Sequence, residues 1–78
     1  MVKNRYDEFV SILEKKKEIS FYLYNVEYTI VKVKDDSYLI KQFGIEHNYT
    51  YSSLNNLFDK FIVYGDILKD CLNDIKII

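Results

Sequence analysis

Apolar side chains recur at helical spacing in two stretches of the chain. In residues 4–17 they form one stripe, at Tyr6, Phe9, Val10 and Leu13. In residues 52–61 they form a second, at Leu54, Leu57, Phe58 and Phe61. The pattern predicts one helix from an Asn4 N-cap to Lys17, and another from a Ser52 or Ser53 cap to Phe61.

Residues 19–43 have a different pattern, dense in β-branched and aromatic side chains that suit strands. Polar breaks at Asn25-Val26 and Asp35-Asp36 divide this stretch into expected strands at 19–24, 27–34 and 37–43. A two-residue turn at Asn25-Val26 would place Leu23 opposite Tyr28 on the core side.

The second turn allows two registers. A two-residue loop at Asp35-Asp36 places Leu39 and Phe43 on the core side, whereas a three-residue loop with a bulge places Tyr38 and Ile40 there. The sequence leaves this choice open, and in both registers large apolar groups remain on the opposite face.

That second face supplies the candidate binding residues. In the expected register of the first hairpin, Tyr22, Tyr24, Val31 and Val33 share it, and Tyr38 joins the candidates. Short helices do not readily cover both faces of a sheet, and an exposed apolar patch is typical of an interface. The alternative is that a helix or Ile77-Ile78 folds over this face.

The remaining segments complete a single α+β domain of residues 1–78. Residues 45–51 are expected to return as a short fourth strand, and Asp66 to cap a final helix. That helix would point Ile67, Leu68, Cys71 and Leu72 inward, while 75–78 pairs as a strand or docks over the core. The predicted fold is a three- or four-stranded antiparallel β-meander with one N-terminal helix and two C-terminal helices.

Charge and composition narrow the function. The 78 residues include 11 basic and 12 acidic ones, whereas a general grip on nucleic acid needs a basic excess. Nucleic acid is therefore not the expected partner, although base stacking on sheet tyrosines stays open as the alternative function. With no signal-peptide pattern and no apolar run of about 18 residues, we expect a cytoplasmic protein without membrane insertion.

Catalytic and metal-binding patterns are not evident in the sequence. His47 is the one histidine, and neighbouring Glu46 would point to the opposite side of an extended segment. Cys71 lies on an apolar stripe beside aspartates that raise a thiol pKa, so we interpret it as a core residue. Asp66, Asp70 and Asp74 are interpreted as a solvated face. We therefore expect no catalytic residue, no metal and no cofactor.

A wider resemblance spans most of the chain. The tyrosine-rich meander, Ser-Leu-Asn-Asn-Leu-Phe-Asp-Lys-Phe at 53–61 and Tyr-Gly-Asp-Ile-Leu-Lys-Asp-Cys-Leu-Asn-Asp-Ile at 64–75 carry it. The pattern resembles small uncharacterised proteins of AT-rich Firmicutes and their phages or mobile elements, although Asn25-Val26 departs from their frequent Asn-Gly turn. Such genomes encode inhibitors of host defence, including anti-CRISPR proteins.

Together these observations predict a non-enzymatic protein-binding module. The resemblance implies an inhibitor of a host defence protein, and it transfers no site residues. The expected partner is another protein, or a second copy in a homodimer, bound through the tyrosine-rich sheet face.

Overall fold

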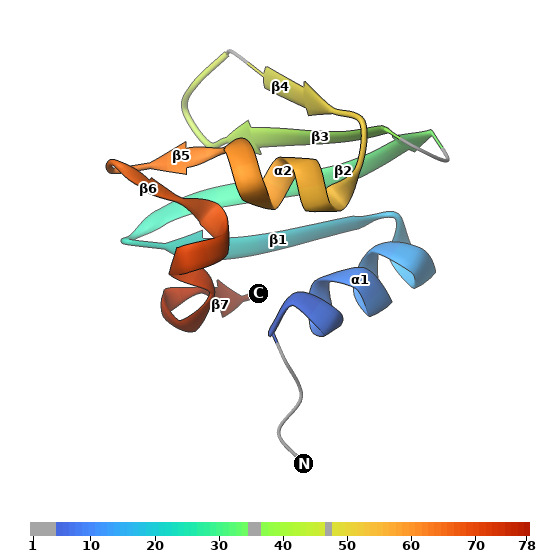
Figure 1. Cartoon of the computed structure of the whole chain (residues 1–78), viewed down its shortest axis with the longest axis horizontal. Helices are drawn as coiled ribbons and strands as arrows, with labels where there is room; N and C mark the ends of the chain where they lie inside the picture. Colours follow the sequence, from blue (N-terminus) through green and yellow to red (C-terminus); the bar gives the residue numbers. More distant parts are fainter. Residues whose placement is uncertain (1–4, 35–36, 47) are drawn as a thin grey trace.

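The computed structural model describes residues 5–34, 37–46 and 48–78. It confirms the α+β class: the helical segments lie on one side of an antiparallel sheet (Figure 1). In chain order the elements are α1 (Arg5–Lys16), β1 (Glu18–Leu23), β2 (Val26–Lys34), β3 (Ser37–Gln42), β4 (Asn48–Tyr51), α2 (Leu54–Lys60), β5 (Ile62–Val63), β6 (Asp66–Ile67), the 3-10 helix η1 (Leu68–Asp74) and β7 (Lys76–Ile77).

The main sheet has five strands in the order β4-β3-β2-β1-β7, rather than the three or four that we predicted. The additional strand is β7, which pairs with β1 at the far edge and places Ile77 opposite Phe21. The C-terminal segment therefore extends the sheet and does not fold over its second face (Figure 1).

Helix α1 forms where the first stripe predicted it, with Phe9 and Leu13 buried. It ends at Lys17, whose φ of 66° is left-handed and whose backbone N–H donates to the Leu13 carbonyl at 3.0 Å. This is a common way to close the last turn of a helix. The predicted N-cap, Asn4, lies outside the described residues.

The first hairpin turns one residue earlier than predicted. Leu23 pairs with Val26, so Tyr24 and Asn25 are the turn residues, with φ of 52° and 63°. Two positive φ angles make a type I′ turn, whose twist matches that of the strands. Asn25 was thus correctly expected to be left-handed, but its partner in the turn is Tyr24, not Val26.

The strand pairing consequently shifts by two residues. Phe21 lies opposite Tyr28, whereas the predicted turn placed Leu23 opposite Tyr28. Side chains alternate with a period of two, so a shift of two keeps the side chains that remain in the two strands on their predicted faces, and Tyr24 alone moves into the turn. Ile19, Phe21 and Leu23 accordingly all face the core.

The second hairpin adopts the register of the bulged alternative, but its loop has two residues instead of three and the bulge lies within β2. Lys32 pairs with Tyr38 and Lys34 with Ser37, which leaves the extra residue, Val33, at the irregularity. Ile40 is buried and Tyr38 packs partly against the core, as the bulged alternative required. The loop residues Asp35 and Asp36 lie outside the described part of the chain.

Helix α2 confirms the second stripe, since Leu54, Leu57, Phe58 and Phe61 are all buried. The Ser53 side chain caps it by accepting a hydrogen bond from the Asn56 backbone N–H at 3.0 Å. Strand β4 precedes this helix at the position expected for a fourth strand.

The segment after α2 differs from the prediction. Val63 pairs with Asp66, and Tyr64 and Gly65 form a second type I′ turn with φ of 51° and 87°. Asp66 therefore belongs to a strand and caps no helix. The final helix is the 3-10 helix η1, and Ile67 is its N-cap residue without a side-chain hydrogen bond. The expected inward positions of Leu68 and Cys71 are confirmed.

A single cluster of buried side chains joins the inner sheet face to the helices. The ring of Phe9 lies 5.3 Å from Phe21 on β1 and 5.3 Å from Phe58 on α2, edge-on to both. Ring pairs in this geometry contribute about 0.5–1.5 kcal/mol beyond the burial of their area. No described helix is long and apolar enough to cross a membrane.

Leu57→Ala tests the packing of α2. Leu57 is 0% exposed, so the change should leave a cavity and lower the free energy of unfolding by about 2–5 kcal/mol. Lys60→Ala, at an exposed position of the same helix, should change it by less than about 0.5 kcal/mol. Urea unfolding followed by circular dichroism measures both. Equal stability of the two variants would contradict the packing described for α2.

Candidate functional site

The outer face of the sheet is left uncovered by the described helices (Figure 1). Strand pairing arranges its side chains in rows across the sheet. One row contains Tyr22, Glu27 and Phe43; the next contains Ser20, Thr29, Lys41 and Asn48; the third contains Glu18, Val31, Leu39 and Thr50.

The middle row is polar from β1 to β4 and divides this face there, whereas the exposed apolar residue Ile78 lies beside Ser20 at the β7 edge. Its Ser20 and Thr29 hydroxyls are hydrogen bonded to each other at 3.0 Å. Tyr22 and the third row lie four residues apart along β1, which is about 13 Å at roughly 3.3 Å per residue. The outer face is therefore not one continuous apolar patch.

The predicted binding residues consequently separate. Tyr22 and Val31 do share the outer face, but in different rows, and Val33 is 52% exposed at the bulge beyond them. Tyr24 leaves the sheet in the first turn, and Tyr38 packs toward the core. The structure does not bring Tyr22, Tyr24 and Tyr38, the tyrosines named for base stacking, together on one sheet face, although Tyr22 and Tyr24 are both exposed.

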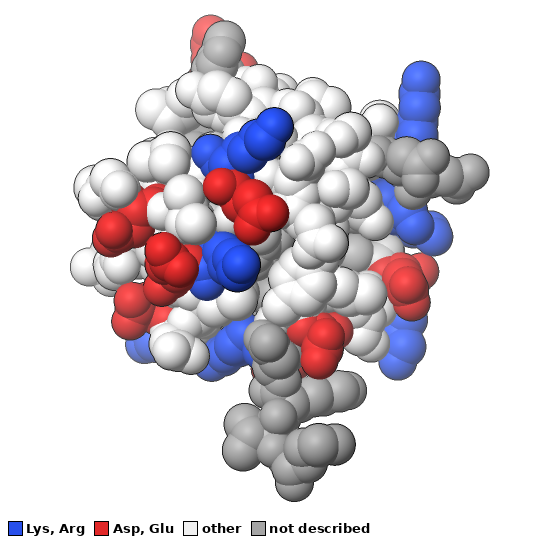
Figure 2. Space-filling view, in the orientation of Figure 1, with Lys and Arg blue, Asp and Glu red and all other residues white. Residues whose placement is uncertain are grey.

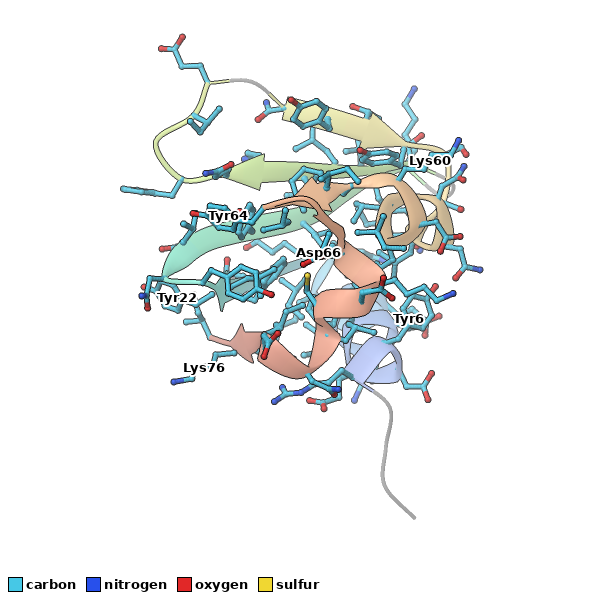
Figure 3. All side chains as sticks on the ribbon, turned by 60° about the vertical axis from the view of Figure 1, so that its left-hand side comes forward. Tyr6, Tyr22, Lys60, Tyr64, Asp66 and Lys76 are labelled. Carbon is cyan, nitrogen blue, oxygen red and sulfur yellow. The ribbon has the colours of Figure 1, made fainter. Side chains whose placement is uncertain are left out.

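The turns of two hairpins meet at one end of the sheet. Tyr24, at the tip of the β1–β2 hairpin, packs edge-on against Tyr64, at the tip of the β5–β6 hairpin. The ring centroids are 5.6 Å apart with an interplanar angle of 65°. Figure 3 shows this end, with Tyr64 and Tyr22 projecting from it.

Both tyrosines occupy the first central position of their type I′ turn, with φ near +50°. Asparagine and glycine are the residues preferred there, and a left-handed conformation costs another L-residue about 1–2 kcal/mol. The Tyr24–Tyr64 ring contact offsets part of this cost. Tyr64 nevertheless exposes 71% of its surface, so burial does not explain its place in the turn.

The hydroxyl of Tyr24 reaches η1. It lies 3.3 Å from Asp74 Oδ2 and 3.8 Å from Cys71 Sγ. A hydroxyl has one proton, and the carboxylate is the stronger acceptor of the two. Hydrogen bonding to Cys71, with desolvation and the nearby Asp74, raises the pKa of Tyr24 to about 12. Tyr24 is therefore a neutral hydrogen-bond donor at physiological pH.

Cys71 lies beneath Tyr24 and is 1% exposed. Its thiol donates to the Ile67 carbonyl at 3.5 Å, which is a fitting arrangement for a small core residue. Burial raises the thiol pKa, and the charges of Asp66, Asp74 and Asp70 raise it further against the lowering effect of Tyr24. These shifts favour the unreactive thiol, in agreement with the sequence interpretation.

Two more aromatic groups lie on the outward side of the same end. Phe43 is 79% exposed, and its N–H donates to the Glu27 carbonyl at 2.9 Å, which places it in one row with Tyr22. A shallow hollow of about 530 Å³ lies between them and is also lined by Asn25. We refer to Tyr22, Tyr24, Phe43 and Tyr64 together as the hairpin-tip surface.

Acidic side chains lie next to this surface, on the side of the sheet that carries the helices. A group of acidic side chains lies over β6 and η1 in Figure 2, and Asp66, Asp70 and Asp74 all act on the Cys71 thiol. Their oxygens do not converge on a point: within residues 5–34, 37–46 and 48–78, no cluster of His, Cys, Asp and Glu is suited to a metal ion. His47 lies outside these ranges.

A separate cleft of about 420 Å³ lies between α1, α2 and η1. Its polar groups are directed at one another, since Tyr6 Oη donates to Asn55 Oδ1 at 2.8 Å and Lys69 Nζ lies 4.0 Å from Asp59 Oδ1. Phe58 and Leu72 complete its lining. Polar side chains that line the cleft are therefore engaged with one another, which makes them less available to a ligand.

Comparison with known proteins gave no match of this chain to a family model, to a curated protein or to a solved structure.

Tyr64 and Phe43 were not among the candidates predicted from the sequence. A signal for Tyr64 was present, because Tyr64-Gly65 stands between short apolar pairs as a turn dipeptide stands between strands. Phe43 was assigned to the core side in one of the two open registers and became an outer-face residue in the other.

The burial of Cys71 gives a chemical prediction. Because the thiol is enclosed and its pKa is raised, alkylation of the folded protein at neutral pH should be slow and should accelerate on unfolding in urea. Cys71→Ser should lower the free energy of unfolding by about 1–3 kcal/mol, since it buries a more polar group. Mass spectrometry of iodoacetamide-treated samples measures the labelling. Labelling at the rate of a free cysteine in the native state would contradict this placement.

Tyr64→Asn tests whether Tyr64 serves the fold. Asparagine suits the left-handed position before Gly65, but the change removes a ring contact that is worth about 0.5–1.5 kcal/mol. The two effects oppose, so the free energy of unfolding should stay within about 1 kcal/mol of the wild type. Tyr64→Val, with a β-branch at positive φ, is the contrasting variant and should lose about 1–3 kcal/mol. A loss well above about 1 kcal/mol for Tyr64→Asn would assign the Tyr64 ring a structural role, and an equal loss for both variants would contradict the importance of the left-handed backbone.

Proposed function

We propose that this chain is a small non-enzymatic protein-binding module that docks a partner protein through the hairpin-tip surface. The observation that carries the proposal is the position of Tyr64. A backbone conformation unfavourable for tyrosine holds its ring in solvent, 71% exposed, beside a second tyrosine held in the same way. Residues held in unfavourable backbone conformations are concentrated at functional sites.

The chemistry of the surface supports a protein partner. Tyrosine and phenylalanine are enriched at the centres of interfaces, where they bring a large contact area and lose little rotamer entropy on binding. The exposed fractions are 45% for Tyr22, 42% for Tyr24 and 79% for Phe43. Four exposed aromatic rings at one end of a small domain form the kind of exposed apolar cluster that is typical of an interaction site.

The arrangement also favours the end of the sheet over its open face. The polar row of Ser20, Thr29 and Lys41 interrupts the outer face, whereas the hairpin-tip surface continues around the β1–β2 turn from Phe43 and Tyr22 to Tyr24 and Tyr64. A partner that grips this end can contact rings on both sides of the hairpin. The surface proposed here therefore retains Tyr22 and Tyr24 from the sequence prediction and replaces Val31, Val33 and Tyr38.

A narrower hypothesis concerns the biological role. The resemblance to proteins of phages and mobile elements supports an inhibitor of a host defence protein, with the hairpin-tip surface blocking its target. The identity of the partner will show whether the protein inhibits host defence, and this question is separate from whether the partner binds the hairpin-tip surface.

A comparison of variants tests the proposal. Wild type, Tyr64→Asn and Val33→Thr are immobilised and used to capture partners from the organism that encodes the chain, and affinity is then measured with the purified partner. Val33 is an exposed apolar residue at the bulge, 52% exposed against 71% for Tyr64, and it lies away from the hairpin tips. We expect Tyr64→Asn to weaken binding at least about tenfold, and Val33→Thr to change it less than about twofold.

The oligomeric state is measured in parallel, because the same aromatic surface would suit a second copy. If the occupant is a second copy, light scattering over a range of concentrations should show a dimer for the wild type and a monomer for Tyr64→Asn. A partner that binds wild type and Tyr64→Asn equally, in a protein that stays monomeric, would refute the proposed surface.

A further inference from the structure

The inner half of the hairpin-tip surface, formed by Tyr24 and Tyr64, has acidic groups beside it. Asp66 directly follows the Tyr64-Gly65 turn, and Asp74 lies 3.3 Å from the Tyr24 hydroxyl. Asp70 is an exposed residue of η1 between them in sequence, and its charge, with those of Asp66 and Asp74, acts on the thiol beneath Tyr24. Two carboxylates therefore adjoin the ring pair, that of Asp74 at the Tyr24 hydroxyl and that of Asp66 after the Tyr64 turn, and Asp70 adds a third on the same 3-10 helix as Asp74.

The two lysines nearest to these carboxylates in the sequence, Lys69 and Lys76, have their contacts away from the ring pair. Lys69, the lysine of η1, lies 4.0 Å from Asp59 on α2. Lys76, on β7, pairs with Tyr22 of β1 and therefore lies on the outward half of the surface. Figure 3 shows Asp66 near Tyr64 and Lys76 at the lower edge of this end. The chain as a whole is nearly neutral, so the acidic character is a local property of this half.

From this combination, and on the basis of the proposed function, we infer that the partner presents a basic side chain, an arginine, to the Tyr24–Tyr64 pair. The guanidinium would lie against a tyrosine ring and donate hydrogen bonds to the neighbouring carboxylates. Arginine suits both contacts, because its planar group stacks on aromatic faces and its N–H groups match carboxylate geometry.

Charge complementarity separates this occupant from a nucleic acid and from an apolar segment, and the concentration dependence measured below separates it from a second copy. A nucleic acid would bring phosphates toward Asp66, Asp70 and Asp74 and be repelled. An apolar segment would bury the rings and leave the carboxylates partly desolvated without a partner, which is unfavourable. A second copy of this chain could bring its own Lys15, Lys16 and Lys17, which stand at the end of α1.

The rings and the carboxylates make separable contributions, and this gives the test. The probe is a seven-residue peptide of alternating alanine and arginine whose two ends are capped so that they carry no charge. Its matched control has citrulline in place of arginine, which keeps the shape of the side chain without the charge. Binding is followed by NMR, using backbone amide shifts and the ring signals of labelled tyrosines. We expect the arginine peptide to shift Tyr24, Tyr64 and the amides of η1, and the citrulline peptide to bind at least about fivefold more weakly.

Three variants complete the test. Tyr64→Asn removes a ring, and Asp70→Asn/Asp74→Asn removes two charges but keeps an acceptor for the Tyr24 hydroxyl. Each should weaken binding of the arginine peptide at least about fivefold. Glu14→Gln removes an exposed charge from the C-terminal part of α1 and should leave binding unchanged.

Each outcome decides between the two proposals. Loss of binding in Tyr64→Asn but not in the aspartate variant, or equal binding of the citrulline peptide, overturns the basic partner while leaving the hairpin-tip surface in place. If the aspartate variant loses binding and Tyr64→Asn retains it, the peptide is held by ionic attraction alone, and the inference is overturned. No shift with the arginine peptide overturns it also, whereas failure of the captured partner to respond to Tyr64→Asn refutes the surface itself. Concentration-dependent shifts without peptide, abolished by Tyr64→Asn, identify a second copy as the occupant and overturn an arginine-bearing partner.

Discussion

The contact of Phe9 with Phe21 and Phe58 joins the three main parts of this fold. Phe9 belongs to α1, Phe21 to β1 and Phe58 to α2, and the three rings are 0%, 0% and 2% exposed. A chain of this length buries only about 60% of its unfolded surface, so it has apolar material for one core layer. Because these rings bring both helices to the same side of the sheet, the other side is left to solvent. The open face and the exposed hairpin tips are consequences of that one-sided core.

Local patterns predicted the segments that contribute to this core. The stripes of α1 and α2 follow from the helical period, and the faces of β1 and β2 follow from alternation, which survived a register error of two residues. The errors occurred where local preference was contradicted. Tyrosine is a poor residue for a left-handed turn position, so the turn was placed at Asn25-Val26. Asp66 has the side chain of a helix cap, yet it pairs with Val63 in a short hairpin whose strands are too brief to show alternation.

The candidate site could be predicted only in part, because it depends on contacts between distant segments. Tyr22 and Tyr24 were identified from the sequence as exposed apolar residues. Tyr64 joins Tyr24 across 40 positions, and neither residue indicates the other without the paths of both hairpins. The polar row of Ser20 and Thr29, which excludes Val31 from the same patch, likewise appears only when the strand register is known. Non-local pairing of this kind leaves no periodic trace in a single sequence.

The positions of the exposed aromatic and polar side chains also reflect the tendency of an uncovered sheet to associate with other sheets. A flat apolar face and long free edges invite association with other sheets. Here the outer face carries a polar row, and the edge strand β7 has two residues while β4 has four. The exposed aromatic rings are instead concentrated at turns, where the backbone makes no continuous ladder for another strand to join. The exposed rings lie at the turns, and the features that oppose non-specific strand pairing lie on the face and edges of the sheet, so the proposed binding surface and this protection occupy different parts of the molecule.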